Sequence, residues 1–184
     1  MGLFSLEHGK LAYLADFVLY GASVVAVAAY LLLVAPPALR LENLALVMLG
    51  LASWSLIEYG LHRFILHGIQ PFKRWHVMHH LQPKNLICTP TLLSATLILI
   101  LVFLPALLLS DLWRASALTL GLLAGYLVYS VTHHALHHWR TGNAWFNRRR
   151  HWHALHHKHL DAPGYYGVTS GLWDHVFGTA RPAT

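Results

Sequence analysis

Four apolar runs, each long enough to cross a lipid bilayer, constrain the fold of this 184-residue chain more than any other feature. A membrane-spanning helix needs about 20 mostly apolar residues, and the runs occupy roughly residues 11–35, 41–66, 91–109 and 113–136. Inside a bilayer only helices and closed barrels satisfy all of their backbone hydrogen bonds. We therefore expect an all-α, polytopic membrane protein with four transmembrane helices.

The composition agrees with a lipid environment, since only 11% of the residues are charged against about 25% in an ordinary soluble domain. The first run is longer than the apolar core of a secretory signal peptide, so we expect it to be retained as a span. Cys88 is the only cysteine, which excludes an internal disulfide and a thiolate metal cage. The net charge of +6 favours a membrane surface as the partner of the basic residues, and not nucleic acid.

The basic residues also predict the orientation. Four spans place the N-terminus, the 67–90 loop and the C-terminal segment on one side of the membrane. The other side carries only Arg40 and Arg114 of the 13 lysines and arginines. The positive-inside rule therefore places the loop and the C-terminal segment in the cytoplasm. We expect one domain, residues 1–184, with a cytoplasmic cap formed by 67–90 and 139–184.

Sixteen histidines are concentrated on this side in a pattern that occurs twice. Histidines at the end of the second span precede an HxxHH motif, and histidines at the end of the fourth span precede another. Positions i, i+3 and i+4 share one face of a helix, so each motif presents three imidazoles to one point. Imidazole suits iron, copper, nickel and zinc, and ten such ligands can hold two ions with positions left for O2. The two motifs comprise His76, His79, His80, His153, His156 and His157.

The histidines at the ends of the spans are less regular. His62 and His67 are five residues apart, about 140° around an ideal α-helix, so both face one ion only if the helix frays or bulges. The fourth span ends in two pairs with one-turn spacing, His133 with His137 and His134 with His138, and spacing does not distinguish them. The remaining histidines fall outside the pattern, and we expect none of them to bind metal: His8, His151, His159 and His175.

Two carboxylates are candidates for holding the ligands in place. Glu58 lies one turn before His62 in an apolar helix, and a carboxylate at membrane depth is costly and usually functional. We expect it to fix the tautomer of His62, the alternative being an ion pair with Arg63 or another cation, and we expect Asp174 to have a similar role. The Arg148–Arg150 run is interpreted as a contact to lipid headgroups or an orientation signal.

Several segments resemble the fatty acid hydroxylase and sterol desaturase superfamily of integral-membrane di-iron enzymes, and fatty acid 2-hydroxylases most. They are EYGLHRFILH (58–67), HVMHH (76–80), PTL (90–92), THHALHH (132–138), HALHH (153–157) and GVTSGLWDHVFGT (167–179). The resemblance covers roughly residues 50–180. The third histidine motif of the family has the pattern T-H-x-x-L-H-H. Thr132 and Leu136 match its threonine and leucine, and this match selects His133 with His137 as the ligand pair. The implied metal ligands are His62, His67, His76, His79, His80, His133, His137, His153, His156 and His157.

The resemblance implies O2-dependent hydroxylation of a lipid acyl chain at two iron ions, which zinc could replace. The chain departs from the eukaryotic enzymes in a short loop, because His76 follows His67 by nine positions. Only about ten residues precede the first span, so electrons are expected from a separate donor, such as a ferredoxin or a cytochrome b5-like protein. Hydroxylation or desaturation of a sterol, a carotenoid or a lipid headgroup remains open, and the carotenoid alternative would pair His133 with His138. A non-enzymatic metal protein is a rival, although a transporter would place its ligands near mid-membrane.

Overall fold

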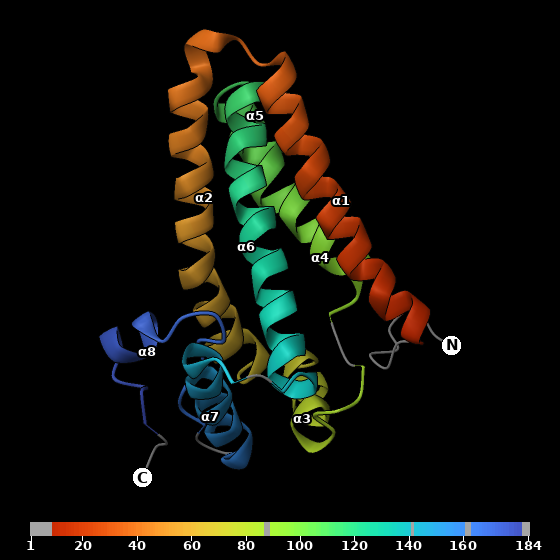
Figure 1. Ribbon diagram of the computed structural model, residues 1–184, viewed down its shortest axis with the longest axis vertical. Helices are drawn as coiled ribbons and strands as arrows, with labels where there is room; N and C mark the ends of the chain where they lie inside the picture. The colour runs from red at the N-terminus through yellow and green to blue at the C-terminus, as the bar shows by residue number, and fades with distance from the viewer. Residues whose placement is uncertain (1–8, 87–88, 141, 161–162, 182–184) are drawn as a thin grey trace. The chain divides into compact units, whose positions relative to one another are not determined.

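The computed structural model describes residues 9–86, 89–140, 142–160 and 163–181. Every regular element among these residues is a helix (Figure 1), which confirms the all-α class. The α-helices are α1 (Lys10–Val34), α2 (Arg40–Gly60), α3 (Phe72–Leu81), α4 (Thr91–Ile98), α5 (Leu104–Leu109), α6 (Leu112–His138), α7 (Ala144–Lys158) and α8 (Leu172–Val176). Pro37–Leu39 forms the 3-10 turn η1, and Leu61–Leu66 and Leu99–Phe103 form the π-helical segments η2 and η3.

Four helical stretches are long and apolar enough to cross a membrane, as predicted: Lys10–Val34, Pro37–Leu66, Thr91–Leu109 and Leu112–His138. Their ends lie within four residues of the ends expected from the apolar runs. The largest difference is at the second span, where the turn η1 continues directly into α2. The hydrophobic runs therefore sufficed to locate the four candidate spans.

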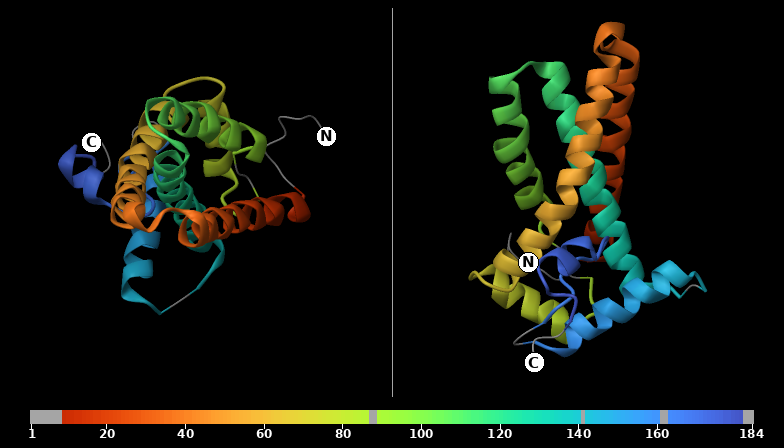
Figure 2. Two further views of the ribbon diagram at one scale, coloured as in Figure 1. Left: turned by 90° about the horizontal axis from the view of Figure 1, so that it is seen from above. Right: turned by 90° about the vertical axis from the view of Figure 1, so that its left-hand side faces the viewer.

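The chain divides into two compact units, and the boundaries between them fall within α2, after α3 and within α6. Unit 1 comprises residues 1–54 and 86–127, and unit 2 comprises residues 55–85 and 128–184. In unit 1, α1 and α2 form one antiparallel hairpin, while α4 with α5 and α6 form another (Figures 1 and 2).

Glycines allow two helices of unit 1 to approach closely. A Cβ atom at Gly50 of α2 would collide with the backbone of Leu118, and one at Gly121 of α6 would collide with the backbone of Val47. Small residues at such crossings let helix backbones pack against one another within a membrane. These two glycines therefore set the spacing of α2 and α6 in unit 1.

A buried carboxylate joins the first span to the third. Thr91 at the start of α4 donates a hydrogen bond of 2.5 Å to Asp16 of α1. One turn further along each helix, the hydroxyls of Tyr20 and Ser94 are 2.7 Å apart. Hydrogen bonds of this kind satisfy polar groups that would be costly inside a membrane, so Asp16 is accommodated as a helix-packing residue.

Unit 2 combines the ends of two spans with the short helices of the polar segments. It contains the end of α2 with η2, then α3, the end of α6, α7 and α8. Residues 163–171, which we call the carbonyl loop, lead into α8. All ten histidines that the family resemblance implies as ligands belong to this unit.

Candidate metal centre

The ten histidines lie in two groups of five, and within each group the available ring nitrogens are all within 4.8 Å of one another. Group 1 consists of His62, His67, His76, His80 and His156. Group 2 consists of His79, His133, His137, His153 and His157. Each HxxHH motif contributes histidines to both groups, so the motif histidines are divided between two points and do not all converge on one.

A π-helical turn solves the geometric problem that the spacing of His62 and His67 posed. In η2 the amide of His67 donates to the carbonyl of His62 over 3.2 Å, a hydrogen bond between residues five apart. Such a turn places residues five apart above one another, and the centroids of the two rings are 5.3 Å apart. The π-turn contains one residue more than an α-helical turn, and this brings His62 and His67 to the same side of the helix.

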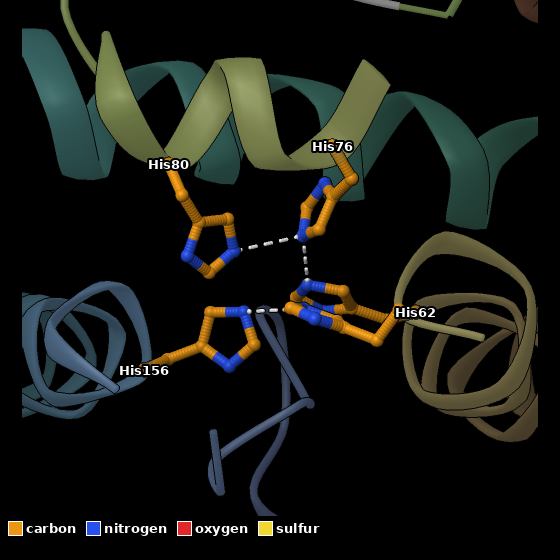
Figure 3. A group of neighbouring side chains, drawn as sticks. His62, His76, His80 and His156 are labelled. Carbon is orange, nitrogen blue, oxygen red and sulfur yellow. Dashed lines mark hydrogen bonds between the residues drawn. The ribbon is translucent and has the colours of Figure 1, made fainter. Parts of the chain in front are cut away.

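The labelled rings of His62, His76, His80 and His156 point toward one another from η2, α3 and α7 (Figure 3). The Nε2 atom of His76 lies 2.9 Å from that of His62 and 3.0 Å from that of His80. The Nε2 atoms of His67 and His156 are 3.1 Å apart. Five imidazole nitrogens therefore converge on one small space, the arrangement that a cation with nitrogen ligands requires.

Two backbone carbonyls of the carbonyl loop fix the orientation of group 1 rings. The Nδ1–H of His62 donates to the carbonyl of Tyr166 over 2.5 Å, and that of His156 donates to the carbonyl of Gly164 over 2.7 Å. With the proton on Nδ1, the lone pair of each Nε2 faces the other rings. Metal-binding histidines almost always hold their second ring nitrogen in this way, so group 1 fits a metal ion.

Group 2 shows the same convergence without these carbonyls. The Nε2 atom of His153 lies 2.8 Å from that of His137 and 3.1 Å from that of His157. The ring of His79 lies 4.8 Å, between centroids, from the ring of His137. Both ring nitrogens of His79 are buried without a hydrogen-bond partner among the described residues. A buried polar group without a partner is costly, and a metal ion would supply one, so group 2 also fits.

The histidines outside the spans are held neutral by their surroundings. Burial lowers the pKa of His67 to about 4 and that of His157 to about 4. Burial, followed by the repulsion of neighbouring rings, lowers the pKa of His76, His153 and His156 well below the ordinary value. Metal binding requires the deprotonated ring nitrogen, so these side chains are available as ligands at neutral pH.

The other histidines belong to neither group. His134 and His138 stack on each other, with centroids 4.4 Å apart, on a different face of α6 from His133 and His137. His151, His159 and His175 also lie outside both groups, and His8 is not among the described residues.

The contacts of Glu58 differ from those we expected. Its carboxylate accepts hydrogen bonds from the backbone amides of Val168 (2.6 Å) and Thr169 (2.9 Å), and from the Thr169 hydroxyl. The ring of His62 bonds instead to a carbonyl of the same loop. Asp174 holds the loop as well, by accepting from the amides of Tyr166 (2.8 Å) and Gly167 (2.9 Å). Both carboxylates therefore contact the carbonyl loop, and the loop contacts the histidines.

Arg149 is a site residue that the sequence analysis misplaced. The basic run that contains it predicts a contact to lipid headgroups or an orientation signal, but Arg149 is only 5% exposed. Its Nε donates to the carbonyl of Val168 over 3.1 Å, and its terminal nitrogen donates to the carbonyl of Gly167. The sequence does contain an indication that Arg149 is buried. It lies one turn before His153 and therefore shares the buried face of α7.

These features define a class: a polytopic membrane protein with a histidine-rich dimetal site. The sequence model of the fatty acid hydroxylase family matches residues 47–179, and the chain belongs to this family. It is 38% identical, over 73% of its length, to the dihydroceramide fatty acyl 2-hydroxylase FAH2 of Arabidopsis thaliana, and covers 60% of that protein. It is 34% identical, again over 73% of its length, to the ceramide very long chain fatty acid hydroxylase scs7 of Schizosaccharomyces pombe, and covers 42% of it.

A solved structure is similar over most of the chain. The hydroxylase domain visible in full-length scs7p superposes with a TM-score of 0.76 and 30% sequence identity, over 91% of this chain and 66% of that one. The chain thus spans about three fifths or less of the curated relatives described above.

Proposed function

We propose that this protein hydroxylates the acyl chain of a lipid with O2, using two iron ions held by the group 1 and group 2 histidines. The convergence of five imidazoles at each of two points carries the proposal, since imidazole is a ligand for iron and few other functions need ten of them together. The family to which the chain belongs is named for this reaction.

The residues of the chain have separate tasks in this proposal. When bound, the iron pair supplies the reductive activation of O2 that oxidises an unactivated C–H bond to an alcohol. The histidines hold the ions and do not act as acids or bases. The carbonyl loop orients group 1, and the protein must position the C–H bond and keep water away from it. Zinc binds imidazole sites more tightly than ferrous iron, so overexpressed protein is expected to need reloading with iron.

The relatives indicate the class of substrate. Their names describe 2-hydroxylation of the fatty acyl group of dihydroceramide and hydroxylation of very long chain ceramides. We propose an amide-linked or free long acyl chain as the substrate of this protein. The carotenoid alternative would require His138 as a ligand, and its position outside group 2 weighs against that reading.

We further propose that the chain acts as one membrane-embedded domain, with residues 67–90 and 139–184 as a cap on the cytoplasmic side. The excess of basic residues in these segments supports that orientation. Electrons would come from a ferredoxin or a cytochrome b5-like protein. Exposed cations such as Lys73, Arg74 and Lys158 would favour an acidic donor through charge complementarity.

The test is reconstitution in vesicles with iron, a reductase, a ferredoxin or cytochrome b5, isotopically labelled O2 and either ceramide or free fatty acid. We expect one labelled oxygen atom in the acyl chain of the product and none with the His156→Ala variant. If the iron-loaded protein reduces O2 but leaves every acyl lipid unchanged, the proposed reaction is wrong.

A further inference from the structure

The two histidine groups differ in what surrounds them. In the part of the chain that the structure describes, the two ring N–H groups that donate to the carbonyl loop both belong to group 1, at His62 and His156. Among the same residues, buried Nδ1 atoms without a hydrogen-bond partner belong to one group 1 ligand, His80, and to three group 2 ligands, His79, His153 and His157. The outer support of the ligands is therefore unequal.

Arg149 reaches the carbonyl loop from the helix that carries ligands of both groups. Its guanidinium donates to two successive carbonyls, those of Gly167 and Val168, and lies 4.8 Å from the centroid of the Trp152 ring. Arg149 thus ties the loop to α7, the same helix that provides His156.

The loop is closely packed, and its peptide groups are bound on two sides. A Cβ atom at Gly167 would collide with the backbone of Ser170, and one at Gly164 would collide with the backbone of Arg181. The amides of residues 166–169 are bound by Glu58 and Asp174. Arg149 is the group that binds carbonyls on the opposite side of the same peptides, so the loop is held from both sides.

We propose that Arg149 is a positioning residue that sets the affinity of group 1 for its metal ion through the carbonyl loop, and leaves group 2 unaffected. The inference rests on the proposed two-metal site and deepens it. A lysine at position 149 would keep the charge but lose the planar fork that donates to two carbonyls at once. The carbonyls of Gly164 and Tyr166 would then hold the Nδ1–H groups of His156 and His62 less well. Losing such support typically weakens metal binding about 10–100-fold.

The experiment uses the full-length protein in detergent, loaded with cobalt(II), which reports its nitrogen ligands through visible absorption. Release of cobalt to a competing chelator is followed in the wild type, in Arg149→Lys and in Arg148→Lys. The last is a matched control, because Arg148 is the exposed neighbour on α7. We expect one of the two ions in Arg149→Lys to be held about 10–100-fold less tightly, and Arg148→Lys to behave as the wild type.

The same substitution in a protein that already carries His153→Ala shows which of the two ions is affected. His153→Ala removes a group 2 ligand and leaves group 1 complete, so the effect of Arg149→Lys should persist on the ion that remains. Glu58→Gln, which loosens the loop from the other side, should weaken the same ion, and it provides the test if Arg149→Lys does not fold by circular dichroism. Equal weakening of both ions, weakening confined to group 2 or no change would each overturn the inference. Wild-type protein that binds two cobalt ions but, loaded with iron, makes no hydroxylated lipid would refute the proposed function alone.

Discussion

Replacing Glu58 with glutamine should destabilise the protein through the carbonyl loop. Three hydrogen bonds reach this carboxylate, from two backbone amides and the Thr169 hydroxyl. Hydrogen bonds to a charged group contribute roughly 1.5–3 kcal/mol, and those between neutral groups roughly 0.5–1.5 kcal/mol. Each bond therefore weakens by about 1 kcal/mol, and the three together by about 3 kcal/mol if they are independent. For chains of this size, each kcal/mol of lost stability usually lowers the Tm by about 2–4 °C. The Tm of the variant should therefore fall by roughly 6–12 °C.

The assay is thermal unfolding in detergent, followed by circular dichroism at a single heating rate. Glu42→Gln is the matched control, because Glu42 lies on the same helix but forms an exposed ion pair with Arg114. Exposed ion pairs contribute little to stability, so its Tm should change by less than half as much. Similar shifts in the two variants would refute the reasoning, since they would show that the buried contacts of Glu58 carry no special weight.

Three further predictions concern the histidines. His133→Ala should lose one of the two metal ions and all hydroxylation, while His134→Ala should lose less than tenfold in activity; the reverse result would move the ligand register by one residue. His156→Ala should abolish hydroxylation and His159→Ala should leave it largely intact, as measured by product analysis, and equal effects would contradict the grouping. Deleting Phe64, whose side chain is 58% exposed, should convert the π-turn into an α-helical turn. His62 and His67 would then be four positions apart and still on one face of the helix. Metal content should then stay at two ions per chain, and loss of an ion would show that the π-turn itself is needed.

Much of the architecture followed from local patterns in the sequence. The spans follow from the lengths of the apolar runs, because backbone groups in lipid must be satisfied within a helix. The burial of His76, His79 and His80 on one side of α3 follows from helical periodicity. Periodicity alone did not predict that His79 belongs to a different group from its two neighbours, since that depends on which other helices face each side chain.

The features that could not be predicted depend on contacts between distant segments. The π-turn between His62 and His67 was recognised only as a conflict with α-helical spacing. Glu58 was identified correctly as a buried carboxylate, but its partners lie 110 residues further on, beyond any helical repeat. Arg149 was assigned from its basic neighbours, although its position on the face of α7 shared with His153 could have marked it as buried.

The metal content of the protein tests the central claim most directly. Purified protein, reloaded with iron without oxygen and freed of excess metal, should contain two ions per chain by elemental analysis. X-ray absorption at the metal edge should show nitrogen ligands. Folded protein that holds one ion or none under these conditions would contradict the assignment of ten histidines to a dimetal centre.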